Sequence, residues 1–189
     1  MTENTIPKVH VIEGALTKEQ AEFYRNLFWE TSVENVGNPR PHFMFQGISW
    51  FPFEPREPMG DSWLPDITIS SLVFWAEKFF LHNYKIEEKF ELKRLFVHTM
   101  KTGAEIEAHV DDGDIYEGKP EFEKHYSGIL ILNDDYEGGE LYFRELGLSI
   151  KPPAGTLVLF RGDAERIHGV TQVTSGYRMS MPIFFREYK

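Results

Sequence analysis

The stretch YSGILILNDDYEGGELYFRELGLSIKPPAGTLVLFR, which runs from Tyr126 to Arg161, decides the fold of this chain. Its apolar runs are short, and clusters of glycine and proline separate them, as in strands joined by turns. We predict strands over 126–132, 140–144, 148–151 and 156–161, with breaks at Gly138-Gly139, Gly147 and Pro152–Gly155. This part of the chain is therefore expected to build sheet.

The same pattern continues on both sides of this stretch. Before it, we predict strands over 92–100 and 105–111, and after it over 166–172 and 177–185. Eight short strands separated by turn residues favour a double-stranded β-helix, or jelly roll. The predicted fold class is mainly β with flanking helices.

The first 91 residues have a different character. Lys8 to Ile12 reads as a short strand, and Thr17 to Gln20 offers a capping box for a helix whose apolar residues recur at helical spacing. A second helix is predicted over about 69–84. We expect a single domain, in which a helical support region (1–91) buttresses the major sheet of a jelly-roll core (92–189).

The segment 37–65 holds six prolines, too many for regular structure. It also holds aromatic residues, namely Phe43, Phe45, Trp50, Phe51 and Phe53. Two interpretations stay open: a long loop that tucks its aromatics against the core, or a lid over a substrate cavity.

Composition excludes several classes of protein. The chain has 189 residues, 41% of them hydrophobic, and a formal net charge of −10, which argues against a general polyanion binder such as a nucleic-acid-binding protein. It has no cysteine, so any metal must be held by His and carboxylate side chains. There is no signal-peptide pattern and no apolar run of membrane-spanning length, so a cytoplasmic protein without a membrane partner is expected.

Three residues of the predicted sheet could bind a metal. In His109-Val110-Asp111, alternation along a strand would point His109 and Asp111 the same way, ~6.5 Å apart, with Glu105 and Glu107 on their face and Ile106, Ala108 and Val110 on the other. His168 lies on the seventh predicted strand, which neighbours the second in a jelly roll. Two histidines and one carboxylate cap one face of an octahedral Fe(II) and leave open positions, as in non-heme iron oxygenases.

The last predicted strand adds an anion-binding pair. Arg178 and Ser180 share one face of that strand. A guanidinium can grip a carboxylate through two parallel hydrogen bonds, and a neighbouring hydroxyl can add a third. The pair therefore suits the distal carboxylate of a dicarboxylic acid.

From about residue 92 to 185 the chain resembles the 2-oxoglutarate- and Fe(II)-dependent dioxygenases, specifically their prolyl 4-hydroxylase-like branch. Four motifs in order carry the resemblance: His109-Val110-Asp111, the run from Ile129 to Leu141, the run from Pro153 to Phe160, and His168-Gly169-Val170 with Arg178. It implies His109, Asp111 and His168 as iron ligands. It also implies Arg178, assisted by Ser180, as the partner of the 2-oxoglutarate C5 carboxylate, with Leu141 and Val170 beside its methylenes.

The implied activity is hydroxylation of an unactivated C–H bond, which consumes 2-oxoglutarate and O2, with ascorbate as a candidate reductant. A prolyl residue in a protein or peptide is the expected substrate, and a free amino acid or other small metabolite is the alternative. A cupin-like metalloenzyme that ignores 2-oxoglutarate, and a non-catalytic binding module, are the competing interpretations.

The chain departs from the family at two tyrosine positions, which hold Met100 and Ile131 here. A hydroxyl that would touch cosubstrate or substrate is then missing or supplied elsewhere. His98, Tyr126 and Tyr142 are the candidates, each with core packing as its other interpretation.

Overall fold

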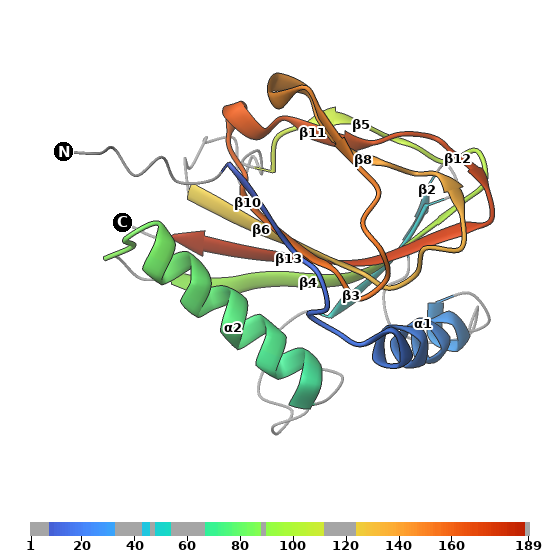
Figure 1. Cartoon of the computed structure of the whole chain (residues 1–189), viewed down its shortest axis with the longest axis horizontal. Helices are drawn as coiled ribbons and strands as arrows, with labels where there is room; N and C mark the ends of the chain where they lie inside the picture. Colours follow the sequence, from blue (N-terminus) through green and yellow to red (C-terminus); the bar gives the residue numbers. More distant parts are fainter. Residues whose placement is uncertain are drawn as a thin grey trace.

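The structure, a computed structural model, describes residues 8–32, 43–45, 48–53, 67–87, 90–111 and 124–187. Within these ranges the chain is mainly β, with two α-helices, α1 (Lys18–Ser32) and α2 (Ile67–Asn83). Two sheets lie face to face, and both helices lie on the outer side of the larger one (Figure 1). The predicted double-stranded β-helix with buttressing helices is confirmed.

The major sheet has seven antiparallel strands. Their order is β1 (Val9–Ile12), β10 (Leu157–Arg161), β6 (Lys124–Ile131), β13 (Tyr177–Glu187), β4 (Phe90–Lys101), β3 (Ile48–Phe53) and β2 (Phe43–Phe45). The opposing sheet has the order β5 (Ile106–His109), β11 (His168–Val170), β8 (Leu141–Phe143) and β9 (Leu148–Ile150). A small pair, β12 (Val173–Ser175) with β7 (Glu137–Gly138), completes the set.

All eight strands predicted for the second half of the chain are present, as β4, β5, β6, β8, β9, β10, β11 and β13. The predicted neighbours, strands two and seven, are β5 and β11, which pair with His168 opposite His109. The prediction missed β7 and β12, because strands of two and three residues carry no readable alternation. The pairing that decides the site was thus predictable.

Alternation along β13 separates the hydrophobic core from the interior of the β-helix. Met179, Met181, Ile183 and Phe185 point to the helices and join a core cluster with Phe80 of α2. Full burial of one such apolar side chain contributes about 1.5–3 kcal/mol. The intervening residues of β13 face the space between the two sheets, where they line a cavity. The central strand therefore supports both the core and the site.

The N-terminal capping box forms as predicted. The Gln20 backbone N–H donates to Thr17 Oγ1 at 3.2 Å, and the Thr17 backbone N–H donates to Gln20 Oε1 at 2.9 Å. These bonds satisfy N–H groups that the first turn of α1 leaves without helical partners. In the described part of the chain, neither helix is long and apolar enough to cross a membrane.

The expectation of no regular structure over 37–65 is wrong for part of that segment. β2 and β3 form a hairpin whose second strand pairs with β4 along its whole length, including Pro52 opposite Phe96. In the residues that the structure describes, β2 pairs only with positions 48–50, so Pro52 has a strand neighbour on one side alone. A proline, which lacks the N–H, is tolerated in such an edge position. The remaining residues of the segment and its aromatic side chains, including the suggested lid, lie outside the described residues.

Candidate metal and cosubstrate site

Two paired strands bring the predicted metal ligands together. His109 ends β5, Asp111 follows it by two residues, and His168 begins β11 opposite His109. Asp111 Oδ1 lies 3.4 Å from His109 Nε2, and Asp111 Oδ2 lies 3.6 Å from His168 Nε2. One ligand atom from each residue lies within 4.8 Å of the others. This spacing and donor set suit a single metal ion bound by all three side chains.

A β-bulge, rather than simple alternation, aims His109 into this cluster. His168 and Val170, two residues apart on β11, pair with His109 and Ile106, three residues apart on β5. The extra residue on β5 turns Ile106 and His109 to the same side, so both line one cavity. The prediction that Ile106 lies on the face opposite to His109 is therefore wrong, because the alternation does not hold across the bulge.

Gly169 permits the close approach of strands at this bulge. A Cβ atom on Gly169 would lie 2.4 Å from the Ile106 carbonyl oxygen and 2.5 Å from the Tyr142 hydroxyl. No side chain fits into that space. The glycine after the distal histidine is therefore needed for β5 and β11 to meet.

Contacts around the three residues fix their orientation. Nδ1 of His109 lies 2.9 Å from the Glu107 carbonyl oxygen, and Nδ1 of His168 lies 3.0 Å from that of Arg166. If Nδ1 carries the proton, it donates to the carbonyl and leaves the Nε2 lone pair for a metal. The Ser127 hydroxyl donates to Asp111 Oδ2, so a residue of β6 also holds the carboxylate. Sequence reasoning missed Ser127, although its place in a predicted strand was a usable signal.

The protonation states of the three residues are linked. Burial alone would raise the pKa of Asp111, but the hydrogen bond with His109, the nearby His168 and the Ser127 hydroxyl together lower it. The hydrogen bond with Asp111 raises the pKa of His109, whose side chain is 45% exposed. Burial lowers the pKa of His168. The cluster therefore offers an ionised carboxylate and a neutral imidazole, with His109 as the residue that holds a proton most readily.

Arg178 forms the opposite end of the site and is 2% exposed. Its Nε donates to the Gly139 carbonyl oxygen at 3.1 Å, and its Nη1 donates to Ser180 Oγ at 2.9 Å. Among the described residues, no carboxylate lies within ion-pair distance of the guanidinium. Burial lowers the pKa of Arg178, while the Tyr136 hydroxyl beside it acts in the other direction. A buried cation of this kind requires an anionic partner.

Gly139 does more than turn the chain. Its φ is +64°, and a Cβ there would lie 2.9 Å from the Tyr136 ring and 3.1 Å from Arg178 Cδ. Glycine thus allows the backbone to approach Arg178 and to present a carbonyl to its Nε. The predicted break at Gly138-Gly139 therefore also orients a site residue.

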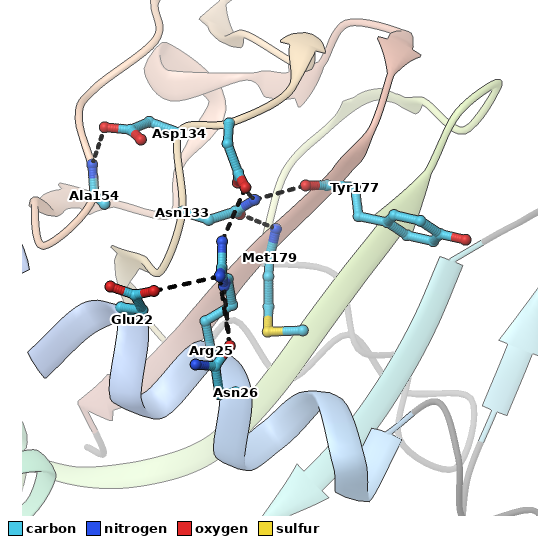
Figure 2. A network of polar contacts seen from close by, with 9 residues as sticks. Glu22, Arg25, Asn26, Asn133, Asp134, Ala154, Tyr177 and Met179 are labelled. Atoms are coloured by element: carbon cyan, nitrogen blue, oxygen red, sulfur yellow. Dashed lines mark hydrogen bonds and ion pairs between the residues drawn. The ribbon is translucent and has the colours of Figure 1, made fainter. Parts of the chain in front are cut away.

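Asn133 holds the strand that carries Arg178. Its Nδ2 donates to the Tyr177 carbonyl oxygen at 2.7 Å, and its Oδ1 accepts from the Met179 N–H at 2.7 Å, so it grips both neighbours of Arg178 (Figure 2). Asn133 Nδ2 also donates to Asp135, which pairs with Arg25 of α1 at 2.9 Å. Helix α1 is thereby linked to the start of β13.

The two ends belong to one cavity of about 500 Å³. The predicted site residues all line it: His109, Asp111, His168, Arg178, Ser180, Leu141 and Val170. Leu141 and Val170 are opposite each other across β8 and β11, both buried, and they give an apolar wall between the metal end and the Arg178 end. A small dicarboxylic acid fits such a cavity and leaves room for a second molecule.

Of the three residues considered as substitutes for the missing tyrosines, only His98 lines this cavity. Tyr126 packs in the core between sheet and helices and donates its hydroxyl to Glu187. Tyr142 points its hydroxyl toward the Ile106 carbonyl oxygen, 3.5 Å away. The alternative interpretation, core packing, therefore holds for Tyr126, and His98 remains as the candidate on β4.

Sequence comparison agrees with this geometry. Residues 95–186 match the model of the 2OG-Fe(II) oxygenase superfamily. The chain is 40% identical over 67 residues to prolyl 3-hydroxylase 2 of Homo sapiens, a match that covers 33% of this chain and 10% of that protein. It is 36% identical over 80 residues to human prolyl 3-hydroxylase 3, covering 39% and 11%. The chain thus spans about a tenth of the length of these curated relatives.

Solved structures share the fold over nearly the whole chain. The viral collagen prolyl hydroxylase of Paramecium Bursaria Chlorella virus-1 superposes with a TM-score of 0.71 at 20% identity, covering 97% of both chains. A prolyl-4-hydroxylase of Pseudomonas putida gives 0.70 at 17% identity, covering 96% of this chain and 94% of that one. With the two-histidine, one-carboxylate cluster, the family match assigns residues 95–186 to the 2OG-Fe(II) oxygenase superfamily, and the structural similarities show that the chain has the fold of the prolyl hydroxylases.

Proposed function

We propose that this chain hydroxylates a prolyl residue of a peptide or protein in a reaction that consumes 2-oxoglutarate and O2. The observation that carries the proposal is one cavity with a His109–Asp111–His168 cluster at one end and the buried Arg178 at the other. The first end would hold Fe(II), and the second would hold the distal carboxylate of 2-oxoglutarate.

The bound iron would supply the activation of O2, with oxidation of 2-oxoglutarate to succinate and CO2. The chain's own residues act by holding and orienting. Ser127 and the backbone carbonyl groups behind both histidines fix the ligand side chains. Arg178 and Ser180 orient the cosubstrate, and the apolar wall of Leu141 and Val170 keeps water from its methylenes.

The remaining part of the cavity supports an apolar substrate group. Pro182 and Phe184 follow Ser180 on the same face of β13 and are half-buried, although they belong to a central strand. Phe184 pairs with Ser127, the residue that hydrogen-bonds Asp111, so this apolar surface lies near the metal end. A pyrrolidine ring suits such a surface.

The test is incubation of the Fe(II)-loaded protein with 2-oxoglutarate, O2 and a panel of proline-containing peptides. We expect succinate in proportion to peptide that gains one oxygen atom, and hydrolysis with amino-acid analysis distinguishes 3- from 4-hydroxyproline. The sequence relatives are named prolyl 3-hydroxylases and one structural neighbour a prolyl-4-hydroxylase, so both products are tested. Turnover of free proline but of no peptide would transfer the proposal to a small-molecule substrate. The cytoplasmic location expected from the sequence stays a prediction.

A further inference from the structure

A buried histidine lies beside the anion-binding end of the cavity. His98 of β4 is 4% exposed and lines the cavity together with Arg178 and Ser180. It is outside the metal cluster, and the resemblance to the family suggests it only as a candidate substitute for a missing tyrosine, without a defined contact. Its position therefore calls for a separate explanation.

Strand register places His98 next to the residues that would bind a carboxylate. β4 and β13 pair with His98 opposite Ser180 and with Met100 opposite Arg178. Side chains directly opposite each other in antiparallel strands have Cβ atoms about 4.5–5.5 Å apart and share a face. Since Ser180 Oγ accepts from Arg178 Nη1 at 2.9 Å, a carboxylate bound by this pair would lie within reach of His98.

Of the two β4 residues opposite this pair, only His98 offers a polar hydrogen. Met100 is fully buried and belongs to the hydrophobic cluster between the sheets. Burial, with the charges of Arg178 and His109, lowers the pKa of His98 to about 3. The imidazole is therefore neutral at physiological pH, with one N–H to donate and no second positive charge beside the guanidinium.

We propose that His98 is a third side chain that binds the distal carboxylate of the cosubstrate, donating a ring N–H to it beside Arg178 and Ser180. This inference rests on the proposed function, because it assumes that the cavity takes 2-oxoglutarate. The carboxylate would then accept hydrogen bonds from side chains of both paired strands, β13 and β4, which would fix its position more firmly than Arg178 alone.

The test is anaerobic binding of 2-oxoglutarate to the Mn(II)-loaded protein, measured by calorimetry, so that no turnover is needed. His98→Phe keeps an aromatic ring but removes the N–H, and we expect its Kd for 2-oxoglutarate to rise about tenfold, as for loss of one hydrogen bond to a charged group. His98→Gln keeps an N–H donor and should stay within about threefold of the wild type. Thr99→Val changes the neighbouring residue, which does not line the cavity, and serves as the matched control with an unchanged Kd.

A truncated ligand identifies which carboxylate His98 contacts. 2-Oxopentanoate has the same carbon chain as 2-oxoglutarate without the distal carboxylate, so the penalty of His98→Phe should disappear with this ligand. If His98→Phe does not fold, His98→Met supplies a second variant without a donor.

The outcomes separate the two proposals. Equal 2-oxoglutarate affinity in the wild type and His98→Phe, or an equal penalty with 2-oxopentanoate, would overturn the assignment of His98 alone. A wild-type protein that binds no 2-oxoglutarate would overturn the proposed function as well.

Discussion

Replacement of Arg178 by methionine is the perturbation that tests the cosubstrate end of the site most directly. Methionine retains much of the side-chain volume but removes the guanidinium, which is 2% exposed and donates to Gly139 and Ser180. Removal of one partner of a buried charge pair costs about 3–5 kcal/mol. Since each 1.4 kcal/mol is a factor of ten in affinity, the Kd for 2-oxoglutarate should rise between about a hundredfold and a few thousandfold.

Arg178→Lys provides a graded comparison. Lysine keeps the positive charge but cannot form two parallel hydrogen bonds, and it loses the bond from Nε to the Gly139 carbonyl oxygen. The loss of one charge-assisted hydrogen bond, about 1.5–3 kcal/mol, corresponds to a rise in Kd of about ten- to a hundredfold. The order of affinities should therefore be wild type, lysine variant, methionine variant.

The assay is anaerobic titration of 2-oxoglutarate into Mn(II)-loaded protein, with metal content and thermal unfolding measured on the same samples. Metal content should not change, because the ligand cluster lies at the other end of the cavity. Unchanged 2-oxoglutarate affinity in a folded Arg178→Met protein would show that the distal carboxylate binds elsewhere, and the argument from a buried, unpaired guanidinium would fail.

Three further predictions concern the metal end. Asp111→Ala should lower Fe(II) affinity by more than about a hundredfold and abolish succinate formation. Ser127→Ala removes only the hydrogen bond to Asp111 and should lower Fe(II) affinity about 10- to 100-fold. Equal losses of affinity in a metal titration of the two variants would contradict the assigned roles. Because the pKa of His109 lies above its ordinary 6.5 and a metal needs the neutral ring, Mn(II) affinity should fall about tenfold per pH unit as pH drops below that raised pKa, and a flat profile from pH 6 to 8 would exclude His109 as a ligand. Gly169→Ala should force β5 and β11 apart and lower both the melting temperature and the metal affinity. The control is Gly147→Ala, at φ +58° with open space around its Cβ, which should cost only about 1–2 kcal/mol of stability and leave metal binding intact.

Local sequence patterns were sufficient where one rule applies at a time. The capping box at Thr17 and Gln20 formed because its two bonds join residues three apart. The eight strands of the second half followed from apolar runs bounded by glycine and proline, and β5 and β11 paired as a jelly roll requires. The hairpin of β2 and β3 was missed because a count of prolines ignores where each proline lies. In the described residues, Pro52 is paired with β4 but lies beyond the part of β3 that pairs with β2, and a proline is tolerated there.

Contacts between distant segments could not be read from the sequence. Arg25 and Asp135 lie 110 residues apart, and neither carries a local signal for the link that joins α1 to the strand of Arg178. Ser127 reaches Asp111 only because the sheet that contains β6 packs against the sheet that contains β5. Such contacts depend on the order of the strands in the two sheets, and the same local sequence pattern is compatible with several strand orders.

The sequence by itself determined which reaction class to propose, because residue types suited to Fe(II) and a dicarboxylate come in an order and spacing that a jelly roll can assemble. Only the tertiary structure decided how they are aimed. The bulge in β5 turns His109 toward His168, and the register of β4 against β13 puts His98 beside Ser180. The physical reason is that residue identity fixes which chemistry is possible. One extra residue in a strand, or a shift in its pairing, moves the reactive side chains to the opposite face of the sheet.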